Sequence, residues 1–167
     1  MKPTLILLTV LLLAGVGIAS GHGRDRGGYE VWTVDQSNSA GKTTGGTLYV
    51  YNGRRLRRDG AATIPERVDL GGAAEQLCLD QTGTAPVRPH MLQFNAGQRH
   101  AILAFVASGH VVFFDAARRQ PLACIDAGIQ AHAAVPSPDQ KYVIVANQNG
   151  KLLQRIRTDY VKNRFTL

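Results

Sequence analysis

The residues best suited to chemistry in this sequence are two histidines, His90 and His132, which stand 42 residues apart at the start of matching segments. An imidazole titrates near neutral pH and binds transition metals through either ring nitrogen. If both segments are innermost strands of neighbouring units, the two side chains meet at a central channel and could ligate a metal ion or a haem. We favour a structural histidine that hydrogen-bonds between neighbouring units, because recurrence across units is what that role predicts.

Three further candidates, Trp32, Asp35 and Gln36, end a predicted inner strand and would point at the mouth of the same channel. The serines lack a Gly-x-Ser-x-Gly context, and Ser137 belongs to a Ser-Pro-Asp turn that explains it without chemistry. The sequence also contains no Walker loop, no His-Glu-x-x-His and no Cys-x-x-Cys-His motif. We therefore assign no catalytic residue, no metal ligand and no cofactor from motifs.

The two cysteines of the chain, Cys78 and Cys124, form a candidate disulfide. Cys124 is predicted in the outermost strand of its unit, and Cys78 lies in the connection that leads to that unit, so the two can be close. An even number of cysteines in an exported chain favours a bond between them. Two buried free thiols are the alternative.

The first 20 residues have the pattern of a signal peptide. Lys2 supplies a positive charge, an apolar run extends from Leu5 to Ile18, and the small residues 19–21 follow. The run is shorter than the ~20 residues that a membrane-spanning helix needs. We expect an exported protein, periplasmic or secreted, that begins between Ser20 and His22 and has no membrane span after cleavage.

The composition narrows the possible partners. A hydrophobic content of 44% with 19% charged residues is typical of a folded domain and not of a disordered chain. Much of the net charge of +7 comes from Arg54, Arg55, Arg57 and Arg58. We interpret this run as a solvated turn after a strand rather than a patch for an acidic polymer. Nucleic acid is a poor partner for a protein that leaves the cytoplasm.

The chain after residue 28 is a repeat of short strands. The segment that begins at His90 aligns with the one that begins at His132, and a period of about 40–45 residues with several strands per unit indicates propeller blades. Further matches at the same offset are Gln98 with Gln140, Arg99 with Lys141, Ile102 with Ile144, and Ala104 with Ala146.

We expect a polar segment at 21–28 and propeller repeats at 29–167. Blade 1 covers about 29–71, a connection covers 72–88, blade 2 covers about 89–128, and blade 3 covers about 129–167. Blade 1 begins with what resembles a second strand, Glu30 to Val34, so its first strand is missing. The connection is predicted to contain a short helical turn at 73–79. Ala101 to Ala107 reads as an inner strand that is buried on both faces.

The third unit resembles the YVTN-type β-propeller repeat through its Ser137-Pro138-Asp139-Gln140 turn and the apolar Tyr142 to Asn147. The Pro89-His90 pair matches the same repeat one unit earlier. Gln140 replaces the usual Gly, and Phe105-Val106 stand where the repeat has Asn. The resemblance implies an all-β fold with blades of four antiparallel strands. Its superfamily includes haem d1-binding nitrite reductase domains, lactonase-like propellers and non-enzymatic surface repeat proteins, so fold alone does not choose the function.

About three blades are present, whereas a propeller closes with typically 4–8. We therefore expect an incomplete ring from the N-terminal part of a longer protein; a natural truncation and closure by oligomerisation are the alternatives. The function we expect is binding or scaffolding at the propeller face, toward a protein or small molecule that the sequence does not identify. The alternatives are an oxidoreductase-associated propeller resembling the haem d1 group, with His90 or His132 facing the cofactor, and a lactonase-like hydrolase.

Overall fold

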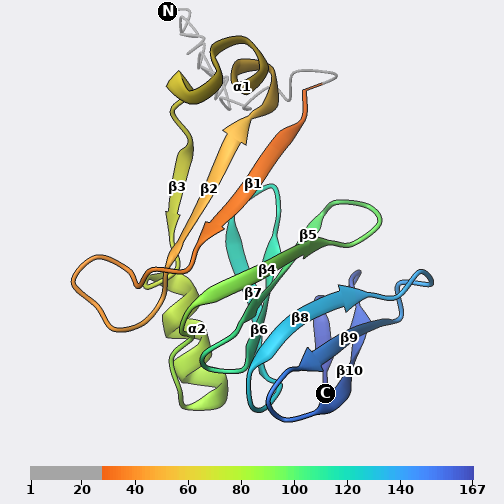
Figure 1. Cartoon of the computed structure of the whole chain (residues 1–167). Coiled ribbons are helices and arrows are strands. Elements are labelled where there is room, and N and C mark those ends of the chain that lie inside the picture. Colours follow the sequence, from red (N-terminus) through yellow and green to blue (C-terminus); the bar gives the residue numbers. More distant parts are fainter. Residues whose placement is uncertain (1–27) are drawn as a thin grey trace, which may run out of the picture.

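The structure is a computed structural model that describes residues 28–167. Three antiparallel sheets lie side by side, and two helices and one 3-10 turn accompany them (Figure 1). The predicted signal peptide and nearly all of the polar segment 21–28 lie outside the described residues. Among the helices of residues 28–167, none has the length and apolarity needed to cross a bilayer.

Each sheet is one predicted blade, and its strands follow one another in chain order. The first sheet contains β1 (Glu30–Asp35), β2 (Thr47–Asn52) and β3 (Glu66–Asp69). The second contains β4 (Pro89–Phe94), β5 (His100–Phe105), β6 (His110–Asp115) and β7 (Gln120–Asp126). The third contains β8 (Ala131–Pro136), β9 (Tyr142–Asn147), β10 (Leu152–Asp159) and β11 (Arg164–Thr166). The prediction of an all-β fold with antiparallel blades in an open array is confirmed; in the described residues the second and third sheets have four strands and the first has three.

The first sheet lacks an innermost strand within the described residues. The backbone N–H of Gly45, just before β2, donates to the carbonyl of Pro86 on the approach to β4 at 2.7 Å. A bond of 3.0 Å at the corresponding place runs in the opposite direction: the backbone N–H of Ala127, on the approach to β8, donates to the carbonyl of Gly109 just before β6. β2 therefore corresponds to β6, the third strand of its blade. It follows that β1 corresponds to a second strand.

The middle sheet is buried on both faces, which is why β5 is apolar along its length. Ala101, Leu103 and Phe105 of β5 pack in a cluster shared with the first sheet. Ile102 and Ala104 of the same strand pack in a second cluster shared with the third sheet. Strand side chains alternate between faces, so one strand supplies both cores.

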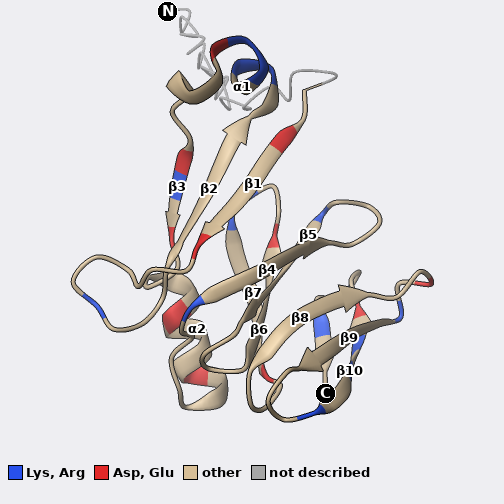
Figure 2. Ribbon diagram, viewed as in Figure 1, with Lys and Arg blue, Asp and Glu red and all other residues tan. Residues whose placement is uncertain are grey.

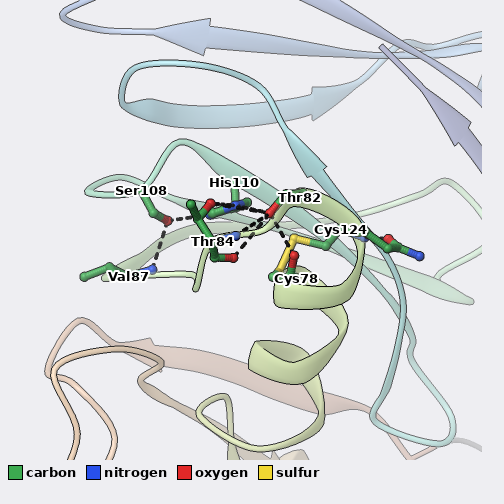
Figure 3. The surroundings of a disulfide bond; sticks show 8 residues. Cys78, Thr82, Thr84, Val87, Ser108, His110 and Cys124 are labelled. Carbon is green, nitrogen blue, oxygen red and sulfur yellow. Dashed lines mark hydrogen bonds between the residues drawn. A yellow bond between two sulfur atoms is a disulfide. The ribbon is translucent and has the colours of Figure 1, made fainter.

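Helix α2 (Ala73–Thr82) occupies the connection between the first two blades and is longer than the predicted turn at 73–79. Ala74 and Cys78 are buried in the cluster shared with the first sheet. Cys78 is joined to Cys124 of β7, with the two Cα atoms 5.1 Å apart (Figure 3). The disulfide therefore fixes the helix to the outer edge of blade 2.

The basic run forms a helix, α1 (Gly53–Asp59), where a solvated turn was predicted. The side chain of Asn52 accepts a hydrogen bond from the backbone N–H of Arg55 at 3.0 Å and caps the helix. Arginine is a good helix former, and Arg57 and Arg58 in the last turn are favourable to the helix dipole. A 3-10 turn, η1 (Gly60–Ala62), follows. Figure 2 shows the basic residues at the end of the first sheet.

Close approach between the turn that joins β5 to β6 and the segment that connects β7 to β8 requires a glycine at position 109. A methyl group there would overlap the carbonyl oxygen of Gly128, and its φ is +77°. Gly83 has the same φ of +77°, but a methyl group there would meet no atom within 4 Å. We expect Gly83→Ala to lower the free energy of unfolding by about 1–2 kcal/mol through backbone strain. Gly109→Ala should cost at least roughly 3 kcal/mol.

Urea unfolding followed by circular dichroism measures both variants. Equal losses in Gly83→Ala and Gly109→Ala would show that the turn between β5 and β6 does not approach the connection between β7 and β8 as closely as the structure has it.

The disulfide closes a loop of 46 residues. In the loop-entropy model, a cross-link of this length restricts the unfolded chain and stabilises the folded state by about 4 kcal/mol. We expect dithiothreitol to lower the urea midpoint of the wild-type chain and to leave the Cys78→Ser/Cys124→Ser variant unchanged. Detection of two free thiols in the denatured, unreduced protein would contradict the pairing.

Candidate functional site

Three of the predicted channel residues come together, one from each blade. His90 is the second residue of β4, His132 is the second residue of β8, and Gln36 directly follows β1. The Nε2 atoms of His90 and His132 are 3.0 Å apart, and Gln36 Nε2 lies 2.7 Å from His90 Nδ1. We call Gln36, His90 and His132 the inner-strand cluster. It exists because β4 packs beside β8 and the end of β1 lies beside β4.

The two imidazole rings of the inner-strand cluster are close and steeply inclined. Their centroids are 4.3 Å apart, and their planes meet at 72°. Burial lowers the pKa of His90 below its ordinary value, and the charges of His132 and Arg88 lower it further. His90 is therefore neutral at pH 7, and a neutral imidazole keeps one nitrogen lone pair available to a ligand.

A hollow of about 480 Å³ adjoins His132 at the end of the β9–β10 hairpin. Its other lining residues combine amides, one ammonium group and aliphatic side chains: Ala146, Asn147, Gln148, Lys151, Leu152 and Leu153. No carboxylate lines this hollow in the part of the chain described. Residues 28–167 contain no group of three or more His, Cys, Asp or Glu side chains that could hold a metal ion. In the described residues the cluster and the hollow together offer imidazole, amide and ammonium groups for hydrogen bonds, beside aliphatic side chains.

Trp32 and Asp35 do not join the inner-strand cluster. The indole of Trp32 packs edge-on against Phe94 at 5.0 Å, and Phe94 is at the opposite end of β4 from His90. A carboxylate oxygen of Asp35 accepts a hydrogen bond from the backbone N–H of Ser37 at 2.8 Å, and this interaction lowers the pKa of Asp35. Trp32 therefore packs blade 1 against blade 2, and Asp35 fixes the backbone where the chain leaves β1.

Arg119 links the first two blades and has no sequence signal that predicts this role. Its guanidinium lies over the ring of Trp32, 4.8 Å from the centroid. It also pairs with the carboxylates of Glu30 at 2.6 Å and Glu66 at 3.4 Å. Arg119 is in the turn between β6 and β7, so only the packing of blade 1 on blade 2 brings it to these partners. Its role is structural.

His110 and His100 are both buried in the core. His110 is 0% exposed, and Figure 3 shows hydroxyl groups on both sides of its ring. Its Nδ1 lies 2.8 Å from Ser108 Oγ, and its Nε2 lies 2.9 Å from Thr82 Oγ1. His100 hydrogen-bonds with Asn163 at 2.8 Å. Hydroxyl and amide partners satisfy these rings, which explains how the core accommodates them.

Together, the three blades define a β-propeller-type fold, of which the described residues form an open sector. Solved structures support this class. A hydrazine synthase structure from Kuenenia stuttgartiensis superposes with a TM-score of 0.56 and 12% identity, over 77% of this chain and 42% of that one. The periplasmic gluconolactonase of Pseudomonas aeruginosa gives a TM-score of 0.55 and 16% identity, over 83% of this chain and 37% of that one.

A candidate 6-phosphogluconolactonase of Bacteroides fragilis NCTC 9343 gives a TM-score of 0.51 and 15% identity, over 83% of this chain and 36% of that one. This chain thus spans less than half the length of each of the three structures. No protein-family model and no curated protein sequence matches it. At these identities the likeness concerns the fold.

The buried His110 makes stability depend on pH. Burial lowers its pKa in the folded state, and the charge of Asp126 partly offsets this effect. Because the pKa of His110 is lower in the folded chain than in the unfolded chain, the unfolded chain binds more protons at acidic pH. The folded state therefore loses stability as the pH falls below about 6.5, the ordinary pKa of histidine. We expect the free energy of unfolding in urea to fall from pH 7.5 to pH 5 and to fall less steeply in His110→Gln.

Asp126→Asn is the matched variant, because an amide oxygen at this position can still accept the hydrogen bond from the backbone of Gly128. Removal of the carboxylate charge should lower the pKa of His110 further, so the free energy of unfolding should fall more steeply between pH 7.5 and pH 5. A slope that is the same in the wild type, His110→Gln and Asp126→Asn would contradict the assignment.

Proposed function

We propose that this chain belongs to an exported β-propeller protein that binds a ligand or partner at the inner-strand cluster and the hollow beside it. The observation that carries the proposal is the convergence of Gln36, His90 and His132 from three separate blades. Propellers commonly bind ligands at the places where loops and strands of different blades meet. The ligand would be a polar or anionic group, since imidazole, amide and ammonium groups surround the site.

Binding is favoured over catalysis by the hydrogen bonds of the two imidazoles. A general base needs an orienting partner and a nucleophile or substrate proton within reach. In the described residues the partners of His90 are Gln36 and His132, and neither histidine has a hydrogen bond with a carboxylate. Such a pair can hold a ligand without transferring a proton to it.

Export is supported by the sequence pattern of residues 1–20 and by the cysteine pair. A disulfide such as Cys78–Cys124 persists in oxidising compartments such as the periplasm or the cell exterior. The same pair in the cytosol would be kept reduced.

Two other functions remain candidates. Lactone hydrolysis is favoured by the structural likeness to a periplasmic gluconolactonase. An oxidoreductase-associated propeller of the haem d1 group is favoured by the repeated histidines, which would face the cofactor. In residues 28–167 no carboxylate lines the hollow, which argues against lactone hydrolysis. Two histidines are a small ligand set for a haem, which argues against the haem d1 alternative.

A hydrolysis assay and a visible spectrum of the purified full-length chain distinguish the three functions. We expect D-glucono-1,5-lactone to hydrolyse at the buffer rate in the wild type and in His90→Gln alike, and the visible spectrum to show no haem bands. Hydrolysis above the buffer rate that is lost in His90→Gln would replace the binding proposal with a lactonase. Haem bands that are lost in His90→Gln or His132→Gln would replace it with the haem d1 alternative.

A further inference from the structure

We infer that His90 and His132 are adjacent ligands of one divalent transition-metal ion, of the Zn²⁺, Ni²⁺, Co²⁺ or Cu²⁺ class, whose other positions open toward the hollow. The inference rests on the proposed function, because it names the chemistry by which the inner-strand cluster would hold a ligand. Imidazole nitrogen is a preferred donor for these ions.

The separation of the two Nε2 atoms fits a shared ion. Metal–nitrogen bonds of about 2.0–2.1 Å at ligand angles of about 90–110° place two nitrogens about 2.9–3.4 Å apart. The observed separation of 3.0 Å between His90 and His132 falls in this range. The pair is therefore already spaced as neighbouring ligands.

The orientation of the rings argues against a straight hydrogen bond between them. A straight N–H···N bond of this length would place the ring centroids about 5 Å apart or more, because each nitrogen lies on the line between the rings. The centroids are only 4.3 Å apart, with the planes inclined at 72°. The contact between the two Nε2 atoms is therefore bent, and no straight N–H···N bond joins the two rings.

Gln36 supplies the orienting contact that metal-binding histidines commonly have. Its side-chain amide lies 2.7 Å from Nδ1 of His90. Rotation of the amide by 180° presents its oxygen to an N–H at Nδ1, which leaves Nε2 unprotonated and directed at the ion. Gln36 would be a positioning residue, since it contacts the ligand and not the ion.

The surroundings predict which ligand completes the site. Arg88 is two residues before His90 in the chain, and its positive charge would oppose a bound cation. Lys151 at the edge of the hollow adds a second positive charge. We therefore expect moderate affinity for the ion alone and tighter binding when an anion occupies the open positions.

Co²⁺ and Zn²⁺ are the probes, and the test uses full-length chain in which His22→Ser removes the one histidine outside the described residues. We expect one Co²⁺ per chain by calorimetry, with visible d–d absorption that Zn²⁺ displaces. His90→Gln and His132→Gln should each weaken binding at least 10-fold and abolish the absorption. His100→Gln is the matched control, because it removes a histidine outside the inner-strand cluster, and it should bind like the parent.

Gln36 provides a second, independent readout. Gln36→Leu should weaken Co²⁺ binding about 10-fold by loss of the orienting contact, and Gln36→Glu should restore it. Thermal unfolding of each variant shows whether its fold is retained.

Failure to bind one ion per chain, or equal binding by the parent, His90→Gln and His132→Gln, would overturn the inference. That result would leave the proposed function standing, because a ligand could still contact the imidazoles directly. Lactone hydrolysis that depends on His90 would instead contradict the proposed function, whether or not Co²⁺ binds.

Discussion

The burial of both faces of the middle sheet is the interaction on which the rest of the structure depends. β5 and β6 direct alternate side chains into two separate hydrophobic clusters, one shared with each neighbouring sheet. A sheet in this position is stabilised by its two neighbours, and each neighbour is stabilised mainly through it, as in other repeat architectures. Burial of apolar surface at these two contacts is the main favourable contribution to the folded state.

The same constraint produces the site and limits the outer sheets. Packing of β8 beside β4 brings His132 to His90, so the inner-strand cluster exists only while blades 2 and 3 are joined. The first sheet gains an additional anchor from α2 and its disulfide to β7. The third sheet has one covered face, and large apolar residues remain exposed on its strands: Val135, Ile144, Leu152 and Leu153. Such exposed apolar surface is typical of an interface with another blade or partner.

The sequence predicted what depends on local periodicity and repetition. The strands, the blade order and the equivalence of His90 with His132 follow from the repeat. The helix at Gly53–Asp59 was missed because its arginines also suit a solvated turn, and only the Asn52 cap decides between them. The burial of His110 and the contacts of Arg119 could not be predicted, because their partners come from segments whose placement depends on packing between blades.

Native-state hydrogen exchange tests the central claim, that the middle sheet is the core from which the outer sheets are stabilised. Amide protons in β5 and β6 should exchange only through global unfolding, with a free energy equal to that from urea. Those in β1 and β10 should exchange faster, through opening of one outer sheet at a time. Equal protection across all three sheets, or greater protection in β1 or β10 than in β5, would contradict the account.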